Sequence, residues 1–130
     1  VDAFSDYGMS LGTAFQIIDD CLDISGEESV VGKSLGTDVT NGKMTLPLIH
    51  MLSRLDGPER RRVEDIIRNG TREDIAGIRA LIVGHDSLNY ALDRARKFVD
   101  DAVARLGRYL EPASQLVIEN IANFVLSRQL

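Results

Sequence analysis

The feature that most limits the fold of this chain is a long apolar stripe in its C-terminal half. Between residues 86 and 109 apolar residues recur at alternating spacings of four and three, which places them on one face of an α-helix. The stripe consists of Leu88, Leu92, Ala95, Val99, Ala102 and Leu106, widened by Ala91, Phe98 and Val103. The opposite face carries Arg94, Lys97, Asp101 and Arg105 and is expected to meet water. We interpret the stripe as ordinary core packing rather than a coiled-coil seam.

The other apolar segments follow the same helical period. They predict helices over residues 4–24, 45–55, 58–69, 71–84 and 113–128. Thr45 is expected to cap the second of these, and Thr71 with Asp74 forms a capping signature for the fourth. In the last helix the residues expected to point inward are Leu116, Val117, Ile121, Phe124 and Val125. No segment alternates as a strand does, so the sequence predicts an all-α helical bundle in a single domain over residues 1–130.

Composition narrows the class of protein further. Of 130 residues 44% are hydrophobic and 27% charged, which is ordinary for a globular protein. The net charge of −5 argues against nucleic acid as a partner, because phosphate-backbone binding needs a basic face. No apolar stretch approaches the length of a membrane span. Cys21 has no second cysteine to pair with, which favours a reducing compartment, the cytoplasm.

Three aspartates stand close together near the end of the first predicted helix. At about 100° per residue, Asp19 and Asp20 lie to either side of Asp23, so the three carboxylates share an arc of roughly 100°. Like charges at this spacing repel, and the negative end of the helix dipole lies beside them. The neighbouring Ile17, Ile18, Leu22 and Ile24 are apolar. We therefore expect a functional site at this point rather than a solvated acidic patch.

Carboxylates without histidine or cysteine companions select a hard cation. Mg²⁺ typically takes one or two carboxylates, keeps water ligands and binds substrate phosphates with its other positions. The cluster therefore predicts a magnesium and diphosphate site. Upstream on the same face lie Gln16, Gly12 and Gly8. Gln16 offers an amide beside the metal, and the glycines either leave open space or allow close packing of another helix.

The segment over residues 25–43 predicts a long loop after the acidic helix, because it contains four glycines and no helical period. Lys33 and Lys43 each follow a glycine in this loop. A lysine binds phosphate as a flexible point charge, so both are candidates to neutralise a departing diphosphate. Asp38 lies between them. His50 and His85 fit no catalytic pattern, and we interpret both as structural or surface residues.

Two stretches carry a resemblance to a known family. Residues 12–23 (GTAFQIIDDCLD), followed by Gly32-Lys33, Asp38 and residues 42–48 (GKMTLPL), closely resemble the second aspartate-rich motif and following loop of trans-isoprenyl diphosphate synthases. The segment over residues 45–48 resembles bacterial long-chain synthases, of the octaprenyl and solanesyl type that make quinone side chains. The ending Phe124-Val125-Leu126-Ser127-Arg128 also agrees.

The resemblance implies a fold, a reaction and roles for residues. The fold would be the C-terminal portion of the all-α isoprenoid synthase bundle, commonly a homodimer. Asp19 and Asp23 would bind Mg²⁺, with Asp20 assisting, and Gln16 and Lys33 would contact the allylic diphosphate. Lys43 and Asp38 would lie near the site. Pyrophosphate would leave the allylic prenyl diphosphate, and the double bond of isopentenyl diphosphate would attack the resulting carbocation.

Several alternatives stay open. The family's first aspartate-rich motif is not in this sequence, so we expect the chain to be a fragment that is inactive alone and weakly stable or self-associating. A terpene cyclase relative normally lacks the second motif and its Gly-Lys loop. A non-catalytic subunit or helical interaction module of the same fold tends to lose the aspartates, whereas Asp19, Asp20 and Asp23 are all present.

Overall fold

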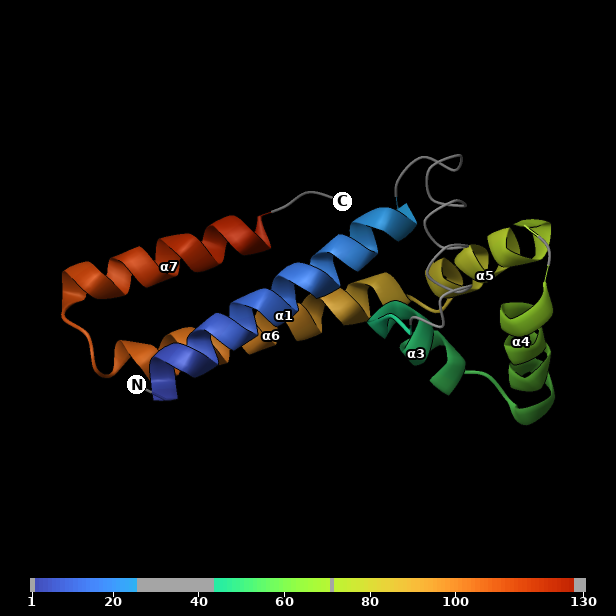
Figure 1. Cartoon of the computed structure of the whole chain (residues 1–130), viewed down its shortest axis with the longest axis horizontal. Helices are drawn as coiled ribbons and strands as arrows, with labels where there is room; N and C mark the ends of the chain where they lie inside the picture. The colour runs from blue at the N-terminus through green and yellow to red at the C-terminus, as the bar shows by residue number, and fades with distance from the viewer. Residues whose placement is uncertain (1, 26–43, 71, 128–130) are drawn as a thin grey trace. The chain divides into compact units, whose positions relative to one another are not determined.

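The computed structural model describes residues 2–25, 44–70 and 72–127, and over these ranges it contains six helices and no strand (Figure 1). The helices are α1 (Asp2–Ser25), α3 (Leu46–Ser53), α4 (Gly57–Asn69), α5 (Arg72–Gly84), α6 (Ser87–Gly107) and α7 (Pro112–Leu126). Their ends agree with the helical periods of the sequence to within a few residues, so the all-α prediction is confirmed. None of the described helices combines the length and apolar character needed to cross a bilayer.

The helices form two compact units. One comprises residues up to Asp19 together with those from Leu92 onward, and the other comprises Asp20–Ala91. The boundaries fall inside α1 and α6, so both helices contribute residues to each unit. The single domain over residues 1–130 stays a prediction.

The first unit is built around an apolar cluster that joins α1, α6 and α7. Its buried members are Tyr7, Ala102, Leu106 and Ile118. The stripe expected on α6 is confirmed at Ala95, Val99, Ala102 and Leu106, none more than 3% exposed. The Tyr7 hydroxyl donates a hydrogen bond to the Ile118 carbonyl at 2.7 Å, and both groups are buried. This bond fixes α7 against α1 at one point, because no solvent competes for either group.

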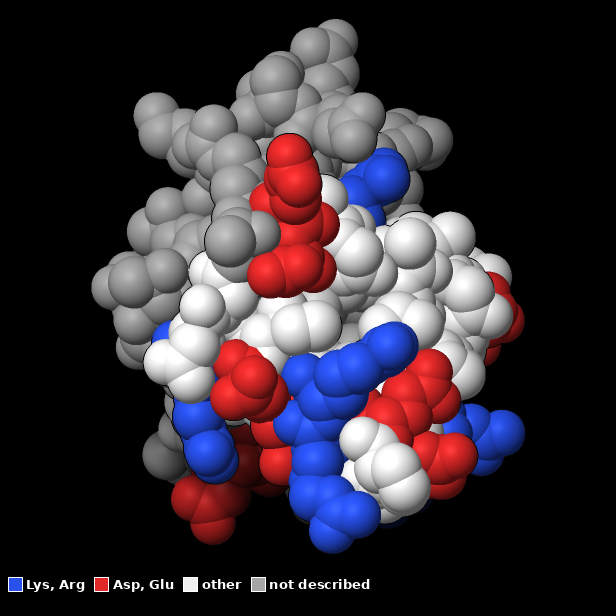
Figure 2. All heavy atoms as spheres, turned by 90° about the vertical axis from the view of Figure 1, so that its right-hand side faces the viewer, with Lys and Arg blue, Asp and Glu red and all other residues white. Residues whose placement is uncertain are grey.

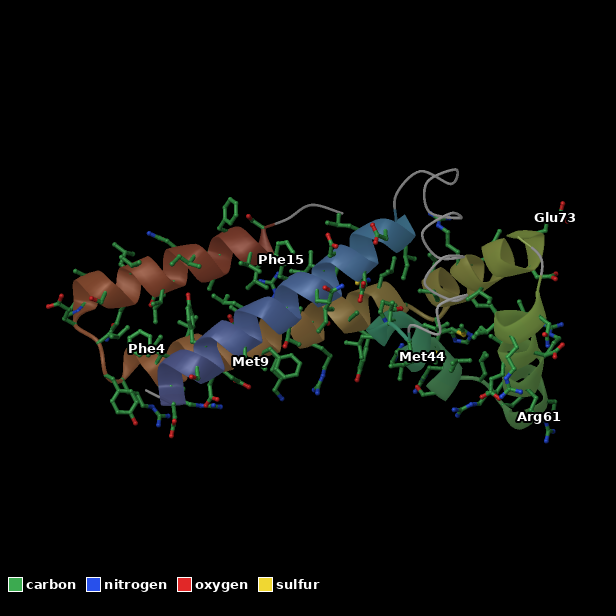
Figure 3. The ribbon with its side chains drawn as sticks, viewed as in Figure 1. Phe4, Met9, Phe15, Met44, Arg61 and Glu73 are labelled. Carbon is green, nitrogen blue, oxygen red and sulfur yellow. The ribbon has the colours of Figure 1, made fainter. Side chains whose placement is uncertain are left out.

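The orientation predicted for α7 is wrong. Leu116, Val117, Ile121 and Phe124 are 46–75% exposed and Val125 is half-buried, whereas Ile118 and Ala122 form the buried face. The sequence presents apolar residues around most of this helix, and the face that packs is the one that reaches Tyr7. Exposed apolar side chains also occur along α1 at Phe4, Met9 and Phe15 (Figure 3).

The prediction that Phe98 widens the buried apolar stripe of α6 is also wrong. Its side chain is 41% exposed, and the Arg94 guanidinium lies over its ring, 5.9 Å from the centroid. Phe98 stands three residues after the core position Ala95 and one before Val99, so it falls at the edge of the buried face. Arg94, Lys97, Asp101 and Arg105 are exposed as predicted.

The second unit has its own core. Ile24 at the end of α1 packs with residues of α3, α4 and α5, namely Leu48, Met51, Leu52, Val63, Ile78 and Ile82. His50 Nδ1 lies 2.8 Å from Ser87 Oγ, and the His50 ring stacks on Tyr90 with centroids 4.0 Å apart. These contacts join α3 to the start of α6. The interpretation of His50 as structural is therefore confirmed.

Two helix ends differ from their predicted chemistry. Thr45 occupies the N-cap position of α3 but makes no capping hydrogen bond, and its hydroxyl is buried without a partner in the described residues. Asp56, in a segment expected only to end the preceding helix, caps α4 by accepting a hydrogen bond from the Glu59 amide at 2.9 Å. The Thr71 cap lies outside the described residues.

Gly70 is required at the end of α4 by close approach. Its amide donates to the Ile66 carbonyl at 2.7 Å, and a Cβ built on Gly70 would lie 2.5 Å from that carbonyl oxygen. Real Cβ atoms do not come so near to backbone oxygen. The prediction that this helix ends at Asn69-Gly70 is confirmed. The glycine is needed because of its close approach to the Ile66 carbonyl, and not because its backbone adopts a left-handed conformation.

The outer surface of α4, which faces the viewer in Figure 2, carries both signs of charge. Arginines at positions 60, 61, 62 and 68 alternate with Glu59, Glu64 and Asp65. The Arg60–Glu64 pair, at 3.0 Å, is about half exposed on both sides and adds little stability. The mixture of charges indicates a solvated face of α4.

Cys21 is fully buried on α1 and forms no disulfide. Burial, reinforced by the neighbouring Asp20 carboxylate, raises the pKa of the Cys21 thiol to about 12. At neutral pH the side chain is therefore a small apolar group with a protonated sulfur, and it does not behave as a thiolate.

Removing the Tyr7 hydroxyl is expected to weaken the contact between α1 and α7. Tyr7→Phe should lower the free energy of unfolding by about 1 kcal/mol, because the Ile118 carbonyl stays buried without this donor. Urea unfolding of the whole protein measures the change. Tyr109→Phe is the matched control, since Tyr109 is 75% exposed and its loss should change stability by no more than about 0.5 kcal/mol.

The raised pKa of Cys21 predicts a pH dependence of stability with a definite sign. Between the ordinary thiol pKa of 9.0 and the folded-state pKa of about 12, the unfolded chain loses the proton while the folded chain keeps it. Stability is therefore unaffected below pH 9 and falls as the pH rises above it. Unfolding curves at pH 8 and pH 10, compared with those of Cys21→Ala, isolate this contribution. An equal pH response in the two proteins would contradict the assignment.

Candidate functional site

The last two turns of α1 carry the three aspartates. Because α1 is a continuous helix from Asp2 to Ser25, the predicted arc of carboxylates follows from its geometry. Asp20 is buried with 7% exposure, Asp19 is half-buried and Asp23 is exposed. The carboxylates therefore run from the interior to the surface along one side of the helix end.

The apolar residues between the aspartates anchor this helix end. Ile17, Ile18 and Ile24 are at most 8% exposed, and Leu22 is half-buried. The aspartates at this helix end therefore lie between buried apolar residues, as the sequence predicts. An ionised carboxylate placed in such a setting is costly unless other groups compensate for it.

One compensating group was not found from the sequence. Arg79 of α5 donates from its Nε to the carbonyl of Ile24 at 2.8 Å, across 55 residues of sequence. The last turn of α1 contains no basic residue of its own. The guanidinium therefore brings positive charge to the negative end of the helix dipole, beside Asp23 in the sequence. No local pattern around Arg79 signals this contact, because it depends on how α5 packs.

Upstream on α1, a groove of about 420 Å³ is lined by Gly8, Met9, Gly12, Thr13, Gln16 and Ile17. A Cβ added at Gly8 or Gly12 would meet nothing within 4 Å, so among the described residues no helix packs closely on these glycines. Of the two readings of the glycines, open space is the one that the described residues support. Gln16 is exposed and lies at the end of this groove nearest to the aspartates.

The other predicted site residues cannot be placed. Lys33, Asp38 and Lys43 lie outside the described residues. Thr45, just after that stretch, has its buried hydroxyl without a partner in the described part of the chain. A buried hydroxyl without a hydrogen-bond partner is rare in proteins. The start of α3 therefore holds a polar group whose partner is not among the described residues.

The donor set is suited to a hard cation. The groups on this helix end are carboxylates and one amide, and the thiol of Cys21 is held protonated by its raised pKa. Within residues 2–25, 44–70 and 72–127, no three His, Cys, Asp or Glu side chains are close enough to hold a metal by themselves. Carboxylate and amide oxygens are ligands that hard cations prefer, and the Mg²⁺ site expected at this helix end stays a prediction.

Solved structures with similar folds are isoprenyl diphosphate synthases. Geranylgeranyl pyrophosphate synthase from Lactobacillus brevis matches with a TM-score of 0.84 at 26% identity, over 98% of this chain and 39% of its own. Polyprenyl synthase from Caulobacter crescentus, complexed with calcium and isoprenyl diphosphate, matches with a TM-score of 0.78 at 37% identity, over 99% of this chain and 40% of its own.

Curated relatives agree with the structural matches. Octaprenyl diphosphate synthase from Haemophilus influenzae is 40% identical over 102 residues, which are 78% of this chain and 31% of the relative. Short chain isoprenyl diphosphate synthase from Methanothermobacter thermautotrophicus is 34% identical over 129 residues, which are 99% of this chain and 40% of the relative. The chain thus spans between 31% and 40% of the length of these relatives.

The family model named Polyprenyl synthetase matches residues 1–82. That stretch contains the aspartates, Gln16, the lysines of the loop and Arg79, so it covers each group described above. With its helical fold and its similarity to these synthases, the chain belongs to the polyprenyl synthetase family.

Proposed function

We propose that the protein is a Mg²⁺-dependent prenyltransferase that condenses isopentenyl diphosphate with an allylic prenyl diphosphate to give a longer polyprenyl diphosphate. The observation that carries the proposal is the arc of Asp19, Asp20 and Asp23 among buried isoleucines at the end of α1, within the part of the chain that the family model matches. A cluster of this kind costs stability, so it requires a compensating use.

The proposal gives each group a role. Asp19 and Asp23 would hold Mg²⁺, Asp20 would act on it directly or through water, and Gln16 and Lys33 would bind the allylic diphosphate. Asp38 and Lys43 would lie near this site. The Caulobacter crescentus synthase, whose structure contains calcium and isoprenyl diphosphate, supports a site that takes a divalent cation together with a diphosphate.

The chemistry asked of these residues is charge stabilisation. When bound, Mg²⁺ supplies positive charge to the diphosphate as the bond between the diphosphate and the allylic carbon breaks. The carboxylates fix where that charge is held, and the loop lysines add donors to the leaving oxygens. The new carbon–carbon bond then forms between the allylic carbon and the terminal carbon of isopentenyl diphosphate. The isopentenyl unit afterwards loses a proton, which restores a double bond. No nucleophilic side chain is needed.

We further propose a long-chain product, of the kind used for quinone side chains. The similarity at 40% identity to an octaprenyl diphosphate synthase supports this choice, together with the Thr45-Leu46-Pro47-Leu48 segment. Homodimeric assembly and the cytoplasm as the compartment complete the proposal. The unpaired, buried thiol of Cys21 is compatible with reducing conditions.

The direct test uses the whole protein with labelled isopentenyl diphosphate and farnesyl or geranyl diphosphate. Extraction and reversed-phase separation should show a series of longer prenyl products, and EDTA should abolish them. Failure to form any product with either allylic substrate at saturating Mg²⁺ would overturn the enzymatic proposal. It would favour the alternative of a non-catalytic subunit.

Substitution of Asp19 should separate catalysis from folding. Asp19→Ala is expected to lower the rate of prenyl transfer by about 100-fold or more, because charge stabilisation of the leaving group is lost. Its thermal midpoint should change far less than its activity, since the carboxylate stands where like charges and the helix dipole oppose it. Asp2→Ala, an exposed acid at the other end of α1, is the control and should keep full activity.

Lys33→Ala should slow the ionisation step itself. In single-turnover reactions with Mg²⁺ and both substrates saturating, the rate of chain transfer is expected to fall by about tenfold or more, because a donor to the leaving oxygens is absent. Lys97→Ala removes an exposed lysine on α6 and serves as the control. A rate for Lys33→Ala equal to that of the control would show that Lys33 is a solvated lysine without a role in the ionisation step.

A further inference from the structure

We infer that Arg79 is a positioning residue for the aspartate site: its hydrogen bond to Ile24 holds the last turn of α1 and so sets the affinity of the site for Mg²⁺ and diphosphate. This inference rests on the proposed function. It concerns a residue outside the aspartate motif and the loop, on a different helix.

The first step of the argument is the position of the bond. Arg79 Nε donates to the Ile24 carbonyl at 2.8 Å, and the contact is partly buried. The last four carbonyls of a helix have no partner within it, and Ile24 is the penultimate residue of α1. In an α-helix the amide of residue 24 bonds to the carbonyl of residue 20, so the turn that ends at Ile24 begins at Asp20. That turn also contains Asp23.

The second step is charge. Three carboxylates occupy the last two turns of α1, and its last turn has no lysine or arginine. The partial negative charge of the helix C-terminus adds to their repulsion, which favours fraying of this end. A guanidinium at the Ile24 carbonyl opposes both effects. The hydrogen bond of Arg79 acts on the backbone of this turn, at the Ile24 carbonyl.

The third step is the rigidity of the anchor. The side chain of Ile24 is buried in a cluster with Ile78, the residue before Arg79, and with Ile82. The apolar contact fixes α5 beside the end of α1, and the guanidinium then reaches the carbonyl from a half-buried position. Groups that orient metal ligands without touching the metal commonly change metal affinity by about 10- to 100-fold when they are removed.

The test compares three variants of the whole protein. Arg79→Met keeps the length and apolar stem of the side chain but removes the donor and the charge. Arg79→Lys keeps the charge and a donor without the guanidinium geometry. Asp56→Ala removes the N-cap of α4 in the same compact unit and destabilises it while leaving Arg79 and Ile24 unchanged.

Two measurements separate positioning from general stability. Hydrogen exchange without ligands should show faster exchange at the end of α1 in Arg79→Met, with α7 unchanged. Calorimetric titration of inorganic pyrophosphate at a series of Mg²⁺ concentrations should show that half-maximal binding needs about tenfold more Mg²⁺ in Arg79→Met. Arg79→Lys should recover part of that loss, and Asp56→Ala should bind as the original protein does.

The outcomes are distinguishable. If the original protein binds pyrophosphate with Mg²⁺ and Arg79→Met binds it equally well, the role of Arg79 is overturned while the proposed function stands. The same conclusion follows if Asp56→Ala loses as much Mg²⁺ affinity as Arg79→Met, because the effect would then be one of stability. If the original protein shows no Mg²⁺-dependent binding of pyrophosphate, the proposed function fails and this inference fails with it.

Discussion

The last two turns of α1 bring buried isoleucines and aspartates together within a few residues, and the rest of the site depends on how that conflict is resolved. Ile24 enters the core formed by α3, α4 and α5, which fixes the helix end in place. The carboxylates on the same turns must then be compensated by other groups. Arg79 supplies positive charge to this helix end from α5, and the cation proposed above would add to it. Packing and electrostatics therefore act on the same five residues, those from Asp20 to Ile24.

The existence and type of each described helix could be predicted from the sequence, because apolar periodicity reports directly on which residues share a face. The orientation of α7 could not. Its apolar residues surround most of the helix, and only the contact of Ile118 with Tyr7 selects the buried side. The start of α4 shows the same limit, since Asp56 could be recognised as a break between helices but its capping bond depends on the local backbone. Phe98 lies at the edge of a stripe, where one position decides between core and solvent.

The candidate site divides in the same way. The arc of Asp19, Asp20 and Asp23 follows from helical geometry alone, and the suitability of this donor set for Mg²⁺ follows from its chemistry. The graded burial of the aspartates and the contact of Arg79 are tertiary properties that no spacing in the sequence encodes. Lys33 and Lys43 could be proposed from their glycine context and their charge, and the resemblance added their roles, but both lie outside the described residues.

The placement of three acids at the negative end of α1 has a consequence for how this protein evolves or is engineered. Replacing any of them by a neutral residue relieves the repulsion between the carboxylates, so a search that rewards only thermal tolerance accepts such a change wherever the repulsion exceeds the contacts that the carboxylate makes. The same changes remove the groups proposed to bind Mg²⁺. Selection for robustness and selection for turnover therefore pull this helix end in opposite directions, and a laboratory screen would have to impose both at once to keep it intact.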